Sequence, residues 1–229
     1  MSINFTQPQL DLGRQIIETC RDLERRGLNQ GTSGNVSARL GTGTIDGFLI
    51  TPTAMPYDIM QPEDMTHMSL DAVSTGRHEP SSEWRVHLDI YRSRPEVGAI
   101  IHTHSGYATT LACLRREIPA FHYMIALFGG SNIRCCEYAI YGTQELSNLV
   151  IKALEGRNAA LMGSHGLVVL GPDLARALML TVEAETLAKM YWRAVQMGQP
   201  RLLSDPQIAS VREKFATYGY GGSAKKQPS

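Results

Sequence analysis

The sequence predicts a fold of the α/β class, because helical and strand-like patterns alternate along its whole length. Segments with apolar residues at helical spacing are followed by short apolar and β-branched runs throughout the 229 residues. No internal repeat and no linker divides the chain. We therefore expect residues 1–229 to form a single domain, with a mobile tail from about residue 219.

The composition excludes several classes of function. The 22 Lys and Arg residues balance 22 Asp and Glu residues, whereas proteins that bind nucleic acids or anionic membranes favour a basic excess. Residues 1–8 lack the pattern of a signal peptide, and no apolar run approaches the ~20 residues of a membrane helix. The four cysteines form no Cys-x-x-Cys pair, so we expect reduced thiols and a cytoplasmic protein.

The first half of the chain predicts two helices and three strands. Apolar residues from Leu12 to Leu23 recur at helical spacing, which predicts a helix over 9–26 that Gly27 caps. Apolar runs predict strands over 36–39, 48–51 and 65–70, with a hairpin turn at 40–47. The residues Ser81-Ser82-Glu83 precede a helical pattern and predict a helix with a serine cap.

The second half predicts a similar alternation after a polar connection that runs to Pro80. Apolar runs predict strands over 99–104 and 133–140, and a further strand pair around His165. Helical spacing and start signals at Thr143 and Pro172 predict four helices, over 105–114, 143–154, 172–197 and 206–218. We assign no regular element to the mostly apolar stretch 118–128.

Three histidines follow apolar strands and suggest a metal site. The run Ala99–Ile101 ends in His102-Thr103-His104, and side chains two residues apart leave the same face of a strand. His165 lies in a Gly-Ser-His-Gly turn within a second apolar strand pair. Neutral imidazoles that converge in this way suit a zinc-type ion. The alternative is that these histidines only form hydrogen bonds within the core.

Hydroxyl and amide side chains gather in three further segments. Asn29–Asn35 and Thr51–Ala54 are loops rich in small residues, and such loops bring backbone N–H groups close to an anion. Ser81 and Ser82 stand at a predicted helix start, where free N–H groups and the helix dipole favour a phosphate. Taken singly, the loops are also compatible with ordinary turns, and the serines with plain capping.

These segments occur in an order that resembles the class II aldolase/adducin family, and especially its L-fuculose 1-phosphate aldolases. The likeness covers about residue 9 to Tyr218, and it rests on six motifs: Gly31-Thr32-Ser33-Gly34-Asn35, Thr51-Pro52-Thr53, Ser81-Ser82-Glu83-Trp84, His102-Thr103-His104, His122-Tyr123-Met124 and His165-Gly166. The resemblance implies a three-layer α/β/α sandwich around a largely antiparallel central sheet. It also implies one Zn²⁺ per subunit and a homotetramer with active sites between subunits.

The resemblance also assigns roles to residues. His102, His104 and His165 would hold the zinc, and Glu83 would be the fourth ligand at rest and the catalytic base once substrate displaces it. Tyr123 from a neighbouring subunit would donate a proton, and Tyr218 would assist. The group that holds the substrate phosphate would be Thr32, Asn35, Thr53, Ala54, Ser81 and Ser82. Two alternatives remain: a structural zinc with Glu83 as a permanent ligand, and Tyr123 as a buried packing aromatic.

The implied reaction is the cleavage of a ketose 1-phosphate, L-fuculose 1-phosphate in the first place, to dihydroxyacetone phosphate and L-lactaldehyde. Zinc would act as a Lewis acid on the three-carbon fragment. Alternatives on the same scaffold are a sugar-phosphate 4-epimerase, a 5-deoxy-pentulose phosphate aldolase, a methylthioribulose-phosphate dehydratase and a non-catalytic adducin-like protein. Ala54 in place of a glycine and Tyr141 in place of a phenylalanine depart from the family pattern.

Overall fold

The central element of the fold is one mixed sheet. The computed structural model describes residues 5–41 and 46–217. Within them, nine strands follow one another in the order β4-β3-β2-β1-β5-β9-β8-β7-β6. Neighbouring strands pair antiparallel except β7 and β8, which are parallel, so the expected largely antiparallel sheet is confirmed. The strands are β1 (Asn35–Arg39), β2 (Phe48–Ile50), β3 (Thr66–Met68), β4 (Ser74–Thr75), β5 (Ala99–Thr103), β6 (Ile118–Pro119), β7 (Asn132–Cys136), β8 (Ala159–Met162) and β9 (Gly166–Gly171).

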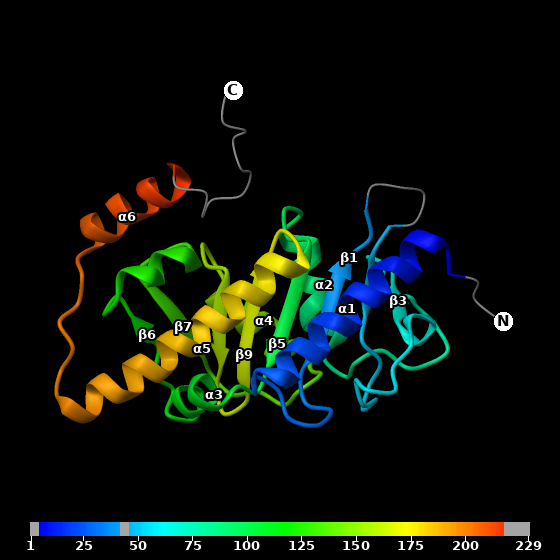
Figure 1. Cartoon of the computed structure of the whole chain (residues 1–229), viewed down its shortest axis with the longest axis horizontal. Helices are drawn as coiled ribbons and strands as arrows, with labels where there is room; N and C mark the ends of the chain where they lie inside the picture. The colour runs from blue at the N-terminus through cyan, green and yellow to red at the C-terminus, as the bar shows by residue number, and fades with distance from the viewer. Residues whose placement is uncertain (1–4, 42–45, 218–229) are drawn as a thin grey trace.

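Helices cover both faces of this sheet, which gives the expected three layers (Figure 1). One layer contains α1 (Gln7–Arg25), α3 (Gly106–Cys113) and α5 (Leu174–Met197). The opposite layer contains α2 (Trp84–Ser93) and α4 (Gln144–Ala153), which pack against each other. Two short 3₁₀ helices complete the fold: η1 (Pro62–Asp64) lies against α1, and η2 (Tyr123–Phe128) lies against the last helix, α6 (Asp205–Thr217).

The central strands are buried on both faces, because each face meets a helical layer. In β5, Ile100 packs into the cluster below α2 and α4, whereas Ile101 packs into the cluster below α1 and α5. In β9, Val168 and Leu170 join the first of these clusters. His102 shares the face of Ile100, so β5 delivers its first histidine on the side where α2 begins.

Most expected elements are present, and the exceptions have local causes. The strand expected over 133–140 ends at Cys136, because its partner β8 ends at Met162 and leaves 137–140 without a neighbour. The expected serine cap is wrong: Trp84 begins α2, Glu83 occupies the N-cap position, and Ser81 forms the preceding turn. The strands β4 and β6 are only two residues long, too short to give a periodic signal.

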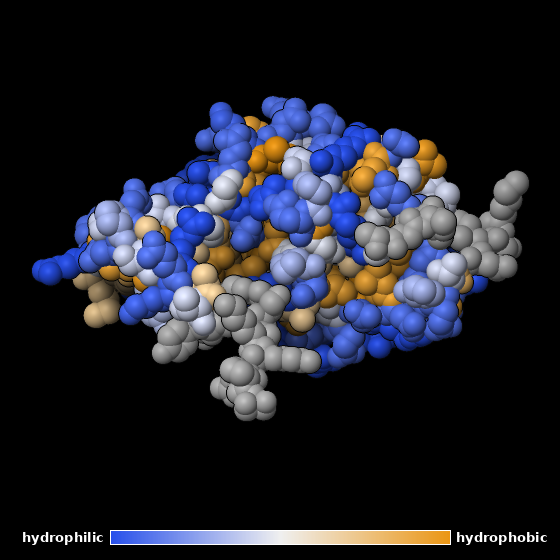
Figure 2. Space-filling model, turned by 90° about the horizontal axis from the view of Figure 1, so that it is seen from above, coloured by the Kyte–Doolittle hydropathy of each residue, from blue (hydrophilic) through white to orange (hydrophobic). Residues whose placement is uncertain are grey.

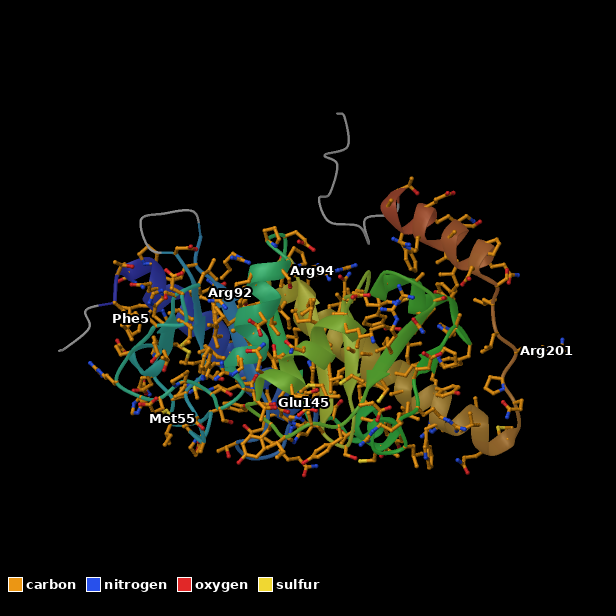
Figure 3. The ribbon with its side chains drawn as sticks, turned by 180° about the vertical axis from the view of Figure 1, so that it is seen from behind. Phe5, Met55, Arg92, Arg94, Glu145 and Arg201 are labelled. Atoms are coloured by element: carbon orange, nitrogen blue, oxygen red, sulfur yellow. The ribbon has the colours of Figure 1, made fainter. Side chains whose placement is uncertain are left out.

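On the face seen from above, most residues are hydrophilic, and hydrophobic residues show in separate patches in the middle and toward one edge (Figure 2). Side chains crowd between the layers, and Arg94 at the end of α2 ties this helix to the chain after α4 (Figure 3). Its guanidinium donates to the carbonyl oxygens of Leu154 and Arg157 and to Asn158 Oδ1, at 3.1–3.4 Å. The four cysteines are free. Among the described helices, none combines the length and apolar character needed to cross a membrane.

Candidate active site and metal centre

The three predicted histidines converge on one point. His102 lies one residue before the end of β5, His104 directly follows the strand, and His165 lies in the turn between β8 and β9. The donor nitrogen atoms of these rings lie within 4.8 Å of one another. Their ring centroids are 4.8–5.0 Å apart, and each pair of ring planes is inclined at 73–76°, so the three imidazoles surround a common point. They can hold a metal ion, as the sequence predicted.

The geometry fits a small divalent cation. Nε2 of His102 lies 3.1 Å from Nε2 of His104. Two ligands of a tetrahedral ion with N–metal bonds of 2.0–2.1 Å are about 3.3 Å apart. Nδ1 of His102 lies 3.0 Å from the carbonyl oxygen of Leu167, to which it donates its proton. This hydrogen bond leaves the lone pair of Nε2 free to face the ion, as is usual for metal-binding histidines.

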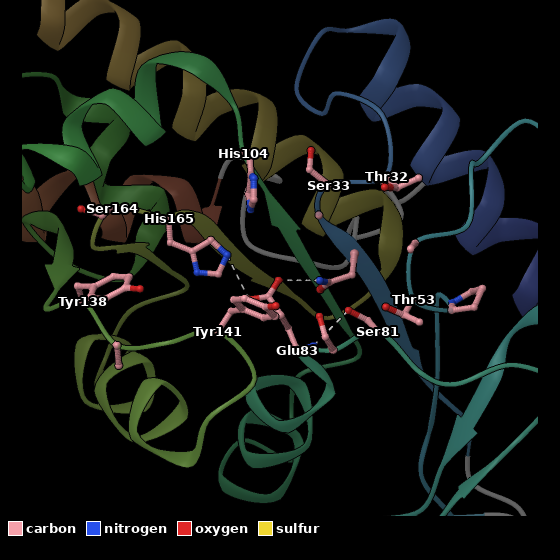
Figure 4. A pocket seen from close by; sticks show the side chains of 16 residues that line it. Thr32, Ser33, Thr53, Ser81, Glu83, His104, Tyr138, Tyr141, Ser164 and His165 are labelled. Atoms are coloured by element: carbon pink, nitrogen blue, oxygen red, sulfur yellow. Dashed lines mark hydrogen bonds and ion pairs between the residues drawn. The ribbon is translucent and has the colours of Figure 1, made fainter.

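Glu83 brings a carboxylate to the same point, because α2 begins directly beside the end of β5. Its Oε2 lies 3.0 Å from Nε2 of His102, and its Oε1 lies 3.2 Å from Nε2 of His165 (Figure 4). The residue is only 7% exposed, and Oε1 has no hydrogen-bond partner other than this facing imidazole. A buried carboxylate oxygen in this position fits the fourth ligand that the sequence predicted.

Burial and mutual charge set the protonation of these groups. Burial lowers the pKa of His104 and of His165 to about 4, and the charge of His102 adds to the effect in both cases. Burial acts to raise the pKa of Glu83, but the facing His102 outweighs it and holds that pKa well below its usual range. Burial acts to lower the pKa of His102, and Glu83 raises it overall. At neutral pH, His104 and His165 are therefore neutral and ready to bind a cation.

A pocket of about 360 Å³ opens beside this metal centre. Its lining contains all six residues predicted to bind the substrate phosphate, namely Thr32, Asn35, Thr53, Ala54, Ser81 and Ser82. Backbone hydrogen bonds join the Thr51–Ala54 loop to the segment before α2: Ser81 N donates to Thr51 O at 3.0 Å, and Thr53 N donates to Glu79 O at 3.1 Å. The view into the pocket shows Thr53 and Ser81 on one side, and His165 and Tyr138 on the other (Figure 4).

The loop of Thr32–Asn35 also lines the pocket, and its backbone at Gly34 lies close to the backbone of His102 in β5. Gly34 has a φ of +82°, and a Cβ there would lie 2.6 Å from the carbonyl oxygen of His102 and 2.5 Å from Nδ2 of Asn29. Asn29 Oδ1 in turn accepts the backbone N–H of His104 at 3.2 Å. Glycine at position 34 therefore lets the Thr32–Asn35 loop lie directly on the strand that carries the histidines.

Ala54 departs from the glycine of the family pattern, and its backbone is in the left-handed region with φ +53°. A non-glycine residue in this conformation costs of the order of 1–2 kcal/mol. The alanine therefore keeps the loop shape that the glycine would give, at some cost in stability. Its backbone N–H remains available as an anion donor.

Asn35 has a second function that the sequence did not indicate. Its Nδ2 donates to Oε2 of Glu83 at 3.0 Å, and its Oδ1 lies 2.6 Å from Nε2 of His87. The asparagine is 3% exposed, so its amide touches the carboxylate from inside the fold. His87, expected as a surface or packing residue, is buried and belongs to the same set of contacts.

Tyr123, one of the two predicted proton donors, does not line this pocket. Tyr123 begins η2, is 49% exposed, and packs its ring against Phe215 of α6 at 6.2 Å. The alternative of a buried packing aromatic is therefore wrong. His122 beside it accepts the backbone N–H of Met124 at 3.3 Å. The predicted contribution of Tyr218 lies outside the described residues.

The pocket mouth contains residues that sequence reasoning assigned no role. Tyr138 and Ser164 line it together with Tyr141, which the sequence marked only as a departure from the family pattern. The strand predicted over 133–140 concealed Tyr138 as a loop residue, and no predicted element placed Tyr141 at the pocket. Their position depends on where β7 ends, which the sequence does not show.

Comparisons with known proteins agree with this site. The family model described as Class II Aldolase and Adducin N-terminal domain matches residues 14–192. A 5-methylthioribulose-1-phosphate/5-deoxyribulose-1-phosphate aldolase of Rhodospirillum rubrum is 43% identical over 220 residues, which are 96% of this chain and 98% of the relative. An L-fuculose phosphate aldolase of Escherichia coli K12 is 46% identical over 213 residues, 91% of this chain and 95% of the relative.

Among solved structures, an L-fuculose 1-phosphate aldolase superposes with a TM-score of 0.86 at 38% identity. The match covers 90% of this chain and 96% of the other. The expected fold and the expected reaction class are both confirmed, because these three proteins, matched over 90% or more of this chain, are aldolases. The chain therefore belongs to the class II aldolase and adducin family, and it is a lyase of the aldolase type.

Proposed function

We propose that the chain is a zinc-dependent aldolase that cleaves L-fuculose 1-phosphate into dihydroxyacetone phosphate and L-lactaldehyde. The observation that carries this proposal is the pocket in which hydroxyl loops adjoin three convergent histidines and a buried carboxylate. Such a site holds a phosphate at one end and places a cation and a base at the other. The L-fuculose phosphate aldolase of Escherichia coli, 46% identical, supports the choice of sugar.

The phosphate end of the pocket uses neutral donors. The hydroxyl groups of Thr53 and Ser82 are exposed to the pocket, and Ser81 stands at the start of α2. The positive end of the α2 dipole lies at that start and stabilises a dianion. We infer that Thr32, Asn35 and the backbone of Ala54 complete the cradle. This placement would orient the sugar so that C2 and C3 lie at the histidines.

His102, His104 and His165 would hold the cation, with Glu83 as a fourth ligand before substrate arrives. Bound there, a zinc ion would supply Lewis-acid stabilisation of the negative charge that develops on the three-carbon fragment. The histidines keep two charges on the ion, because all three ligands are neutral. Asn35, Glu83 and His102 are buried beside the cation site, and this low exposure strengthens the electrostatic interactions there.

Two proton transfers complete the reaction. In the condensation direction, Glu83 removes a proton from C3 of dihydroxyacetone phosphate, and C3 forms a bond to the aldehyde carbon. Tyr123 donates its phenolic proton to the aldehyde oxygen, which becomes the C4 hydroxyl group. Cleavage runs both transfers in reverse, so the C4 proton returns to Tyr123 and Glu83 gives its proton to C3.

Because Tyr123 lies outside its own pocket, we propose that it serves the pocket of a partner subunit in a homotetramer. The half-exposed ring beside α6 supports this arrangement, since it is free on one side. Tyr218 would follow α6 into the same neighbouring site. The free thiols fit a reducing compartment, and we expect the enzyme to act in the cytoplasm.

A second candidate is an aldolase for 5-methylthioribulose or 5-deoxyribulose 1-phosphate. The Rhodospirillum rubrum relative supports it, with 43% identity and a match that spans nearly its full length. The pocket mouth also favours it, because Tyr138, Ala139 and Tyr141 offer apolar surface to an aldehyde tail. A methylthio or methyl group would bury against these rings without requiring a hydrogen-bond partner.

The two candidates differ only in the aldehyde, so a condensation assay separates them. Zinc-loaded protein is incubated with dihydroxyacetone phosphate and, in separate reactions, L-lactaldehyde, 2-(methylthio)acetaldehyde or acetaldehyde. The first proposal predicts the highest kcat/KM with L-lactaldehyde. A higher value with either of the other aldehydes would favour the second candidate, and no product with any of them would contradict aldolase activity.

A further inference from the structure

A buried polar seam runs between β1 and α2, behind the metal centre. On β1, Asn35, Ser37 and Arg39 alternate toward α2, and on α2 the residues Glu83, His87 and Tyr91 follow at intervals of four. Five of these six side chains are 7% exposed or less, all except Arg39. The face of a central strand that meets a helix is normally apolar. Buried polar groups without a function are costly to keep, so this seam needs an explanation.

Five members of the seam, all except Arg39, form a continuous chain of side-chain hydrogen bonds. The Tyr91 hydroxyl lies 2.9 Å from Oγ of Ser37, and Oγ of Ser37 lies 2.6 Å from Nδ1 of His87. Nε2 of His87 lies 2.6 Å from Oδ1 of Asn35, and Nδ2 of Asn35 lies 3.0 Å from Oε2 of Glu83. These hydrogen bonds therefore lead from Tyr91, in the last turn of α2, to the carboxylate at the metal centre.

The charge of Glu83 fixes the direction of every bond in this chain. An ionised carboxylate only accepts, so the NH₂ group of Asn35 must face it and Oδ1 must face His87. Nε2 of His87 therefore carries a proton and donates it to Asn35. Burial lowers the pKa of His87 to about 3, so the ring is neutral and Nδ1 accepts from Ser37. The Ser37 hydroxyl then accepts from Tyr91.

We propose that His87 is a positioning residue for Glu83, because its Nε2–H group fixes the Asn35 amide with the NH₂ side toward the carboxylate. Without this donor, Oδ1 of Asn35 loses its partner, and the amide is no longer held in one place against the carboxylate. The same orientation matters during the reaction, because a protonated Glu83 cannot pass its proton to the NH₂ group. The proton stays on the carboxyl group for transfer to C3. The inference rests on the role of Glu83 at the metal centre proposed above.

The test is a double-mutant cycle on zinc affinity, measured by competition with a chromophoric chelator. His87→Leu introduces an apolar side chain of similar size that has no N–H donor. His87→Gln places an amide N–H donor near the position of Nε2. Partners of metal ligands typically contribute 10–100-fold to affinity. We therefore expect His87→Leu to weaken zinc binding about 10-fold. His87→Gln should stay within about 3-fold of wild type, since it retains the donor.

The second arm repeats both substitutions in a Glu83→Ala background. With no carboxylate to position, His87→Leu should change zinc affinity by less than about 2-fold, since only coupled residues give non-additive effects. An equal loss in both backgrounds would show a merely structural role and would overturn the proposal, as would full affinity in His87→Leu. If His87→Leu does not fold, Ser37→Ala takes its place, because it removes the hydroxyl that fixes the His87 ring. Its loss of zinc affinity should likewise disappear in the Glu83→Ala background.

Cleavage of L-fuculose 1-phosphate by the wild-type protein is measured in parallel. A protein that binds zinc and shows the coupling but cleaves no sugar phosphate would contradict the proposed function and support the positioning role. A protein that cleaves the substrate but shows no coupling between His87 and Glu83 would support the proposed function and contradict the positioning role.

Discussion

Asn35 of β1 and His102 of β5 are cross-strand partners, and both hold the same carboxylate oxygen at 3.0 Å. That oxygen is Oε2 of Glu83, which stands at the start of α2. The antiparallel register of β1 and β5 thus places an imidazole and an amide donor side by side. The start of α2 supplies the carboxylate between them. Two loops and one helix start then build the phosphate end of the pocket around this pair.

The first prediction concerns the metal ligands. His104→Ala and His165→Ala should each lower zinc affinity by more than about 100-fold, because a ligand contributes more than its supporting residues do. The fold should persist, since the histidines occupy strand ends rather than the apolar core. Zinc per chain is measured after gel filtration, with circular dichroism as the check on folding. His67→Ala is the control, because the His67 ring contacts the Thr75 hydroxyl and the backbone of Asp46 near the far edge of the sheet. Stoichiometric zinc in either ligand variant would contradict the assignment.

The second prediction concerns the phosphate. Ser82→Ala removes an exposed hydroxyl from the pocket and should lower kcat/KM for L-fuculose 1-phosphate by roughly 10–100-fold, since hydrogen bonds to charged groups contribute about 1.5–3 kcal/mol. Zinc content should not change. Unphosphorylated L-fuculose is the control substrate, and the substitution should leave its low rate unaffected. Equal losses for both substrates would place Ser82 away from the phosphate.

The third prediction concerns the loop on the histidine strand. Gly34→Ala should cost about 2 kcal/mol or more of unfolding free energy, because it combines a positive φ with a contact that backbone atoms cannot relieve. The matched control is Gly41→Ala, where a Cβ meets nothing within 4 Å, and it should change stability by less than about 0.5 kcal/mol. Urea denaturation of both variants gives the values. Similar midpoints for the two proteins would show that the loop can move away from β5.

Much of this fold and site could be predicted from the sequence. The alternating patterns located the main helices and strands, and His102-Thr103-His104 indicated the metal strand because two-residue spacing directs both rings to one face. The seam was not predicted, because Asn35, Ser37 and Arg39 alternate with apolar residues as the solvent-facing side of an edge strand would. Only the sheet order shows that β1 lies between β2 and β5 and is covered on that side by α2. The single-domain expectation and the homotetramer stay predictions.

The fourth prediction concerns pH. In the folded, metal-free chain the pKa values of His104 and His165 are about 4, whereas an unfolded histidine has a pKa near 6.5. Between these values the unfolded chain binds protons that the folded chain does not, so the free energy of unfolding falls as the pH decreases. His87, with a pKa of about 3, acts in the same direction. His102 has a raised pKa in the folded chain, so it stabilises the fold at low pH. This contribution to the free energy of unfolding is lost only as the pH rises above the pKa of an unfolded histidine.

The measurement is the urea midpoint of metal-free protein at pH 7 and pH 5. We expect the lower midpoint at pH 5. His104→Gln, which cannot titrate, should reduce the difference between the two pH values. A midpoint at pH 5 equal to or above that at pH 7 would show that these imidazoles are not held neutral by burial.

The fifth prediction tests the central claim, that Glu83 is the base and Tyr123 of a partner subunit is the acid. The measurement is exchange of the C3 hydrogen of dihydroxyacetone phosphate with deuterated solvent, followed by NMR beside an assay of cleavage. Glu83→Gln should abolish exchange, whereas Tyr123→Phe should keep exchange and lose cleavage by about 10²–10⁴-fold, since the phenol acts only on the aldehyde oxygen. Hetero-oligomers co-expressed from both variants should recover cleavage, because some interfaces then combine an intact glutamate with an intact tyrosine. Exchange that survives in Glu83→Gln would contradict the claim, and so would verified mixed oligomers that recover no cleavage.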